Sequence, residues 1–246
     1  MREDPIALLI YGLANELGPA ATYRGLPLIH LAAMFDRPDL VAWLLDRGVG
    51  IDFMDRRGRT PLFFAASRRM ARALMKEGAD PRHRDLMEHT PLHAAAKAGR
   101  IDVAHALRLA KRVDLHAQDK RGMTPLHAAA SKGRTRSIDH LLRQGANPNV
   151  MDRYGRHALF HAVAGGHIDA ALSLIDGGAD LEILDDKGTS WLSLARMDQI
   201  GRLQARYQIA LKQESEQEWT LERPTFPRVA FYQGSSQRDF SQSFSI

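Results

Sequence analysis

The sequence predicts an all-α repeat protein: a solenoid of about six stacked helix-pair units, with short β-turn fingers between units and a helical cap at each end. Two observations support this. A phrase like Thr-Pro-Leu-His-Ala-Ala recurs with its first position at residues 27, 60, 90, 124, 157 and 190, so the spacings are 33, 30, 34, 33 and 33. A second phrase, Leu-Leu-x-x-Gly or a close variant, keeps the same interval. Such a fixed period is the signature of stacked supersecondary units.

The first expected element is a capping helix within residues 1–24. Asp4 can serve as its N-cap, and Pro5 suits the first helical position. The apolar stretch that follows, residues 6–14, is short and comes after acidic rather than basic residues, which makes it a poor signal peptide. No apolar run reaches the length needed to cross a membrane. We therefore expect a cytoplasmic protein that does not associate with membranes.

Residues 25–211 form the expected solenoid, in which each unit consists of a turn and two helices. Thr60, Thr90 and Thr124 stand where a helix N-cap is needed, and the proline that follows each one suits the first turn. The alanines leave a thin face for the neighbouring unit, and the leucine pair of the second helix supplies apolar bulk. Glycine can end that helix, and Asp-x-x-Gly favours a type I turn, the finger. Units of this kind must stack in order to bury their apolar faces.

Three departures interrupt the pattern. The second unit is three residues short, with residues 67–69 in place of a longer link between its helices. The third finger has Glu88 where the turn glycine belongs, so we expect another turn type or a strained one. The third unit has Lys-Arg-Val-Asp at 111–114 instead of a closing Gly-Ala-Asp, which predicts a local irregularity. The last unit, residues 190–211, becomes charged and polar, as a terminal cap should.

The composition changes in residues 212–246. This extension holds four basic and five acidic residues, so residues 1–211 carry a net charge of +6 out of the total of +5. Three interpretations stay open. The extension could be disordered and without function, it could carry a short partner-binding motif, or it could strap onto the solenoid through Trp219, Phe226 and Phe231.

The three phrases together resemble the ankyrin repeat over roughly residues 25–210. The resemblance implies that His93 and His127, the phrase histidines, link adjacent fingers through hydrogen bonds. It also implies that the finger tips and first helices form a concave face that varies between members and binds partners. The expected function is therefore binding rather than catalysis.

The residues give no support for an enzyme. No Gly-x-Ser-x-Gly motif occurs, and no Gly-Lys-Ser/Thr follows the glycine pairs at 165–166 and 177–178. The paired carboxylates at 185–186 belong to a finger turn. The absence of cysteine excludes thiolate nucleophiles and cysteine-based zinc sites. We expect no catalytic residue, no cofactor and no small-molecule substrate.

The histidines invite a metal hypothesis, which the repeat register weakens. His89 and His93 are spaced i, i+4, as are His157 and His161, and such pairs can share a helix face. However, His157 occupies the threonine capping position, and His161 stands where leucine is usual, pointing into the stack. No third ligand follows at a fixed spacing, so we expect structural roles and no metal.

The concave-face positions of the ankyrin family, transferred to this chain, give a largely basic surface. Three of the four well-matched fingers carry Arg or Lys in at least two variable positions. We expect this edge to meet an acidic partner, with arginine forks pairing carboxylates or phosphates. Leu86, Met87 and Tyr154 would be the anchors. The alternative is a merely solvated charged face. The candidate partner-binding residues are Arg56, Arg57, Arg59, Arg68, Leu86, Met87, His89, Lys97, Lys120, Arg121, Met123, Lys132, Arg153, Tyr154 and Arg156.

The leading hypothesis is an adaptor or inhibitor, monomeric by itself, that docks an acidic protein on this basic concave face. Nucleic-acid binding along the same stripe is the second hypothesis. The fingers disfavour it, because they offer one aromatic residue, Tyr154, where single-strand binders use several. A third hypothesis is a microbial effector or toxin-neutralising protein that regulates a partner enzyme through its groove or its C-terminal extension.

Overall fold

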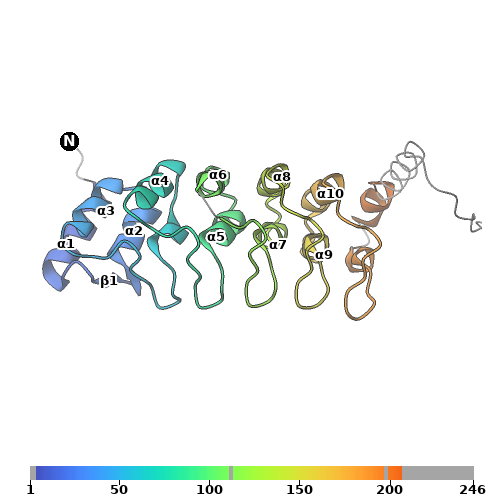
Figure 1. Cartoon of the computed structure of the whole chain (residues 1–246), viewed down its shortest axis with the longest axis horizontal. Coiled ribbons are helices and arrows are strands. Elements are labelled where there is room, and N and C mark those ends of the chain that lie inside the picture. The colour runs from blue at the N-terminus through green and yellow to red at the C-terminus, as the bar shows by residue number, and fades with distance from the viewer. Residues whose placement is uncertain (1–3, 111–112, 197–198, 207–246) are drawn as a thin grey trace, which may run out of the picture.

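The computed structural model describes residues 4–110, 113–196 and 199–206. Within them, six helix pairs follow one another in a single row, which confirms the predicted all-α solenoid (Figure 1). The second helices α4, α6, α8 and α10 form one layer, the first helices α5, α7 and α9 form the other, and the fingers extend beyond the first helices. The first helices are α2 (Leu28–Met34), η1 (Pro61–Phe64), α5 (Pro91–Ala98), α7 (Pro125–Ala130), α9 (Ala158–Ala164) and η2 (Trp191–Leu194). The second helices are α3 (Pro38–Leu45), α4 (Arg68–Lys76), α6 (Ile101–Leu109), α8 (Thr135–Arg143), α10 (Ile168–Asp176) and residues 199–206.

The N-terminal helix, α1 (Pro5–Leu17), begins as the sequence predicts. The Asp4 carboxylate accepts hydrogen bonds from the backbone N–H groups of Ile6 and Ala7. An antiparallel hairpin of β1 (Thr22–Tyr23) and β2 (Leu26–Pro27) then leads into α2. The side chain of Ile10 is fully buried, so α1 covers the open end of the first unit.

The predicted threonine caps are confirmed in two units and wrong in one. The Thr90 hydroxyl accepts from the N–H of His93, while the imidazole Nδ1 of His93 accepts from the Thr90 N–H at 3.1 Å. Thr124 and His127 form the same reciprocal capping box. Thr60 makes no such bond, because its helix η1 is a single 3₁₀ turn rather than an α-helix. The expectation that residues 67–69 replace the link is wrong, because Ser67 caps α4 and Arg68 begins it; the three missing residues are missing from the first helix.

Small and large apolar residues divide the core as predicted. Ala95 and Ala96 are buried on α5, which packs against α7, and their size lets the two helices approach closely. Leu107 and Leu141 are buried on the second helices, where they fill the stack between units. This alternation of thin and bulky faces holds the units in register.

The remaining departures have different outcomes. Glu88 adopts a φ of 63°, so the third finger keeps its turn and places a glutamate in the left-handed region that favours glycine. Residues 111–112 lie outside the described residues, as does the extension 212–246 with its three interpretations.

In the last unit, Trp191 is buried and its indole N–H donates to the carbonyl of Leu181 at 3.0 Å. No helix within the described ranges is long and apolar enough to cross a membrane.

Candidate partner-binding face

The loops at residues 55–59, 85–89, 119–123, 152–156 and 185–189 are the second to sixth fingers, and each is shaped by the aspartate at its first position. The Oδ1 atom of Asp55 accepts from the N–H groups of Arg57 at 2.8 Å and Arg59 at 2.9 Å. The same two bonds, to the residues two and four positions later, recur in the other four fingers. The backbone of the tip is therefore fixed by one carboxylate, whatever side chains the tip carries. The equivalent residues are Asp85, Asp119, Asp152 and Asp185.

Backbone hydrogen bonds join each finger to the next. An N–H of the second position donates to a carbonyl of the third position of the preceding finger, as in Leu86 to Arg57 at 2.9 Å. We call these four bonds the finger ladder. Its other bonds run from Lys120 to Met87, from Arg153 to Arg121 and from Asp186 to Tyr154.

The phrase histidines reinforce the ladder, as the family resemblance implies. Nε2 of His93 donates to the carbonyl of Met123 at 3.0 Å, and Nε2 of His127 donates to that of Arg156 at 3.1 Å. Because Nδ1 of each ring accepts from a backbone N–H, both rings are neutral and carry their proton on Nε2. Burial lowers the pKa of each of these two histidines to about 4. His157 caps α9 by accepting from the N–H of Leu159, as predicted, and burial lowers its pKa to about 4 as well.

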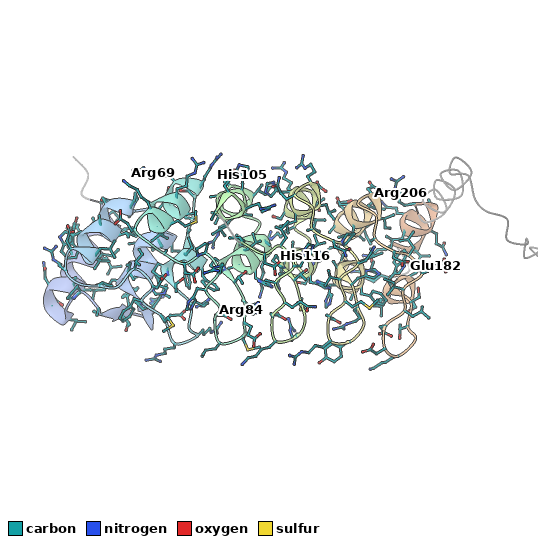
Figure 2. All side chains as sticks on the ribbon, in the orientation of Figure 1. Arg69, Arg84, His105, His116, Glu182 and Arg206 are labelled. Atoms are coloured by element: carbon teal, nitrogen blue, oxygen red, sulfur yellow. The ribbon has the colours of Figure 1, made fainter. Side chains whose placement is uncertain are left out.

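The second and third finger positions carry the exposed cations. Figure 2 shows side chains at the finger tips extending away from the helix layers. None of these cations forms an ion pair or side-chain hydrogen bond with another described residue, so their charges face solvent. On the second, fourth and fifth fingers these residues are Arg56, Arg57, Lys120, Arg121 and Arg153, and the last finger carries Lys187 beside the exposed Asp186.

The fifth finger position points inward, which sequence reasoning missed. Arg59 pairs with Asp55 at 2.6 Å, and Arg156 pairs with Asp152 at 2.9 Å. Met123 is only 5% exposed, so its place in the predicted contact set is wrong. It lacks a polar group that could pair with the finger aspartate, and it packs beneath the finger instead. The recurrence of aspartate-pairing or apolar residues at this position is the signal that could have revealed it.

His89 occupies the same inward position and connects two fingers. Its Nδ1 lies 3.2 Å from Asp85 Oδ2, and its Nε2 lies 3.2 Å from Asp119 Oδ2. His161 contacts the finger of its own unit, with Nε2 2.9 Å from Asp152 Oδ2, and it lies edge-on to His127. These histidines serve the packing of the fingers. Among residues 4–110, 113–196 and 199–206, no three metal-ligating side chains gather closely enough to hold an ion.

Three of the predicted partner-binding residues lie on or just after helices, and they fall in two different layers of the solenoid. Lys97, near the end of α5, is exposed and lines a groove beside the fingers, and Lys132 is exposed just after α7. Arg68 is the first residue of α4 and belongs to the layer of second helices, so the structure does not group it with the finger tips.

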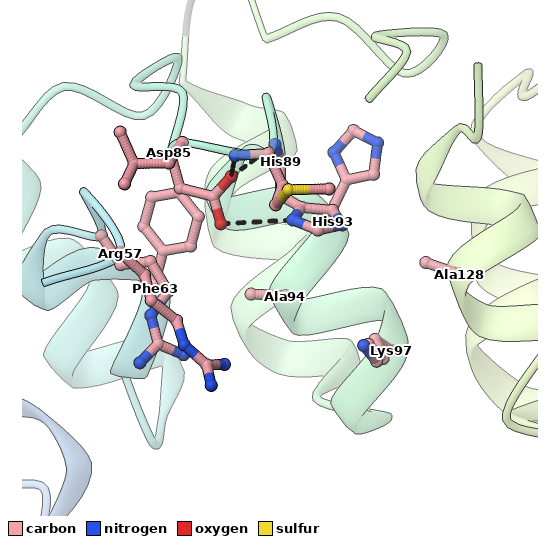
Figure 3. A pocket seen from close by; sticks show the side chains of 11 residues that line it. Arg57, Phe63, Asp85, His89, His93, Ala94, Lys97 and Ala128 are labelled. Carbon is pink, nitrogen blue, oxygen red and sulfur yellow. Dashed lines mark hydrogen bonds and ion pairs between the residues drawn. The ribbon is translucent and has the colours of Figure 1, made fainter. Parts of the chain in front are cut away.

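The groove lies between the second and third fingers and has a volume of about 440 Å³ (Figure 3). Phe63 and Ala94 line it from the helices, and Leu86 and Met87 line it from the third finger. Leu86 and Met87 are exposed by 64% and 47%, as anchors of a contact surface must be. Tyr154 is also exposed, under the guanidinium of Arg156, but does not line this groove.

Comparison with known proteins gives a consistent result. Residues 29–117 and 106–185, together more than half of the chain, match the family model described as ankyrin repeats in three copies. Neurogenic locus notch homolog protein 1 of Mus musculus is 34% identical over 156 residues, which cover 62% of this chain but only 6% of that protein.

Solved structures share the architecture. An ankyrin repeat domain from Acinetobacter baumannii AYE superposes with a TM-score of 0.63 at 25% identity, over 74% of this chain and 96% of that one. The ankyrin repeat domain of Bcl-3, described as a member of the IkappaB protein family, gives a TM-score of 0.63 at 24% identity, over 81% and 96% of the two chains.

Proposed function

Because the chain belongs to the ankyrin-repeat family, whose repeats are protein–protein interaction modules, we propose that it is a non-catalytic adaptor or inhibitor of an acidic protein. The proposed contact surface is the finger face: the tips of the second to fifth fingers and the adjoining first helices. The observation that carries the proposal is the group of five exposed cations on the second, fourth and fifth fingers, none of them paired with a described residue.

The arrangement of these charges supports binding over a merely solvated surface. The fingers carry their own carboxylates, yet those carboxylates accept backbone hydrogen bonds within the finger and stay buried beneath it. In the second, fourth and fifth fingers the cations therefore face outward and the finger aspartate faces inward, whereas the third finger also exposes Glu88, next to Arg84. Such a row of outward-facing cations accelerates encounters with an acidic partner and disfavours basic partners. The fixed ladder also spaces the cations without any cost of ordering the loops on binding.

A charge-reversal experiment tests the proposal. In the finger variant, Arg56, Arg57, Arg121 and Arg153 are changed to Glu; none of their side chains pairs with another residue that the structure describes. The control variant makes the same four-charge reversal on the other layer, at Arg68, Arg69, Arg72 and Lys76 of α4, all of which are exposed. Both variants carry the same net charge, so a general electrostatic effect would change them equally.

The assay is capture from a lysate at low and high salt, followed by titration of the purified captured protein. We expect an acidic protein whose Kd rises at least about a hundredfold in the finger variant, while the α4 variant changes it by less than about fivefold. Circular dichroism checks that both variants remain folded. Equal losses in the two variants, or no loss in either, would contradict the proposal.

The same assay addresses nucleic acid as the ligand. Nucleic-acid binding would fall steeply and linearly on a log–log plot against salt. The described fingers offer Tyr154 as their one exposed aromatic residue, and Arg156 already covers its ring at 4.7 Å. Base stacking, the other source of such affinity, therefore has little support on the finger face. An inhibitory or effector role toward an enzyme would use this same surface.

A further inference from the structure

The groove between the second and third fingers differs in chemistry from the rest of the finger face. The third finger places Leu86 and Met87 at positions where the second finger has two arginines and the fourth has a lysine and an arginine. We infer that this groove receives one large apolar side chain from an acidic segment of the partner, with carboxylates on both sides of that side chain. This inference rests on the proposed function and specifies which segment of the acidic partner is recognised.

The groove exists because of particular side chains in neighbouring units. Ala94 and Ala128 both line it and occupy the same repeat position, where their small size leaves space against the fingers. In the unit before, this position holds Phe64, and in the unit after, it holds His161, so larger rings fill the equivalent space on either side. The apolar hollow is thus confined to the middle of the row.

The apolar wall of the groove is held in place before any partner arrives. The N–H of Leu86 donates to the carbonyl of Arg57 at 2.9 Å, and its side chain lies directly over Gly58. The Met87 N–H donates to Asp85 at 2.8 Å. Both side chains nevertheless remain largely exposed, so a partner group that covers them gains apolar burial without ordering the loop.

The charges around the groove select the flanks of the incoming segment. Arg57 and Lys97 line it, are exposed and pair with no other described residue (Figure 3). Asp85 is the one carboxylate among its lining residues. It is buried, and it accepts from the N–H groups of Met87 and His89 and from the His89 ring. Carboxylates on either side of an apolar residue therefore meet unpaired cations, whereas lysines there would be repelled.

The test uses defined peptides rather than the unknown partner. The probes are fluorescein-labelled Gly-Glu-Asp-Glu-Phe-Glu-Asp-Glu-Gly and the same peptide with alanine in place of phenylalanine, titrated with the full chain by fluorescence anisotropy. We expect the phenylalanine peptide to bind about ten- to a hundredfold more tightly, the ratio that burial of one large apolar side chain gives. A third peptide, with glutamine replacing every Glu and Asp, should bind at least about tenfold more weakly than the first.

A matched pair of variants locates the effect. Met87→Gln should bring the ratio between the phenylalanine and alanine peptides close to one and leave the alanine peptide's affinity unchanged. Met151→Gln changes a methionine of nearly equal exposure, 46% against 47%, that does not line the groove, and it should leave the ratio intact. Both side chains are exposed, so neither variant is expected to unfold the protein.

The outcomes separate the two proposals. If both acidic peptides bind equally and Arg57→Glu weakens both, the acidic-partner function stands and the groove inference is overturned. If the glutamine peptide binds as tightly as the first, the charge selection is overturned. If Met151→Gln lowers the ratio as much as Met87→Gln does, the anchor lies outside this groove. If no peptide binds, the finger face does not recognise acidic segments and both proposals fall.

Discussion

Acidification from about pH 7.5 to about pH 5 should destabilise the solenoid through three buried histidines. His93, His127 and His157 are almost inaccessible to solvent, and burial lowers the pKa of each to about 4. In the unfolded chain a histidine has a pKa of about 6.5. Protonation therefore favours the unfolded chain. The stability that these rings contribute is fully present above about pH 6.5 and is lost as the pH falls toward about 4.

The size of the destabilisation follows from the difference between the histidine pKa in the folded chain and in the unfolded chain. At about pH 5 each histidine is almost fully protonated when unfolded and about one-tenth protonated when folded, which corresponds to about 2 kcal/mol per ring. Three rings give about 6 kcal/mol, which is comparable with the whole stability of a typical domain. The carboxylate of Asp152 does not offset this. Burial works to raise the pKa of Asp152, but bonds from Arg156 and the backbone lower it overall, so the group stays ionised at pH 5.

Urea unfolding followed by circular dichroism at several pH values measures this loss. The informative variant is His93→Phe/His127→Phe, since Phe160 occupies the phrase-histidine position of a later unit. It should be less stable at about pH 7.5, because two hydrogen bonds to the next finger are gone, but its loss on acidification should be smaller by about 4 kcal/mol. Replacement of the exposed His116 by Phe controls for removal of a histidine. An unchanged loss in the double variant would refute the reasoning.

Two further changes test local features of the repeats. Glu88→Gly should stabilise the protein by about 1 kcal/mol, which raises Tm by about 2–4 °C, because it removes a left-handed non-glycine residue and costs only a weak exposed ion pair with Arg84. An unchanged or lower Tm in a thermal scan would show that the third finger needs its glutamate. Thr90→Ala should lower the free energy of unfolding by about 1 kcal/mol, whereas Thr60→Ala should cost less, because the hydroxyl of Thr90 caps a helix and that of Thr60 does not. Equal losses in urea titrations would contradict the assigned caps.

Most of the fold could be predicted from sequence because each residue of the repeated phrase acts locally. Thr90 and His93 cap α5, Thr124 and His127 cap α7 in the same way, and the repeated interval specifies six units even where the cap differs. The shortened second unit could not be resolved in this way. A deletion of three residues changes the interval but does not reveal whether a helix or a loop has lost them, and the loss falls on η1.

The candidate site was predictable in position and less so in detail. Arg57 and Arg59 are chemically identical and two residues apart, yet only Arg57 is free, because the fifth finger position turns back onto Asp55. The groove escaped prediction for another reason. It depends on Phe63 of the second unit, Leu86 of the third and Ala128 of the fourth meeting in space, a relationship that no spacing within a single phrase expresses.

The finger ladder has a consequence for how this surface can change over generations. Its bonds use only main-chain N–H and carbonyl groups, so the ladder itself does not depend on which side chains stand at the second and third finger positions. Mutations there can alter what is recognised while the scaffold stays intact, and selection for a new partner need not first compensate for a weakened fold. The aspartate and the backbone hold each five-residue loop in shape, whereas the residues at its second and third positions determine what it recognises. The finger tips can therefore diverge in sequence.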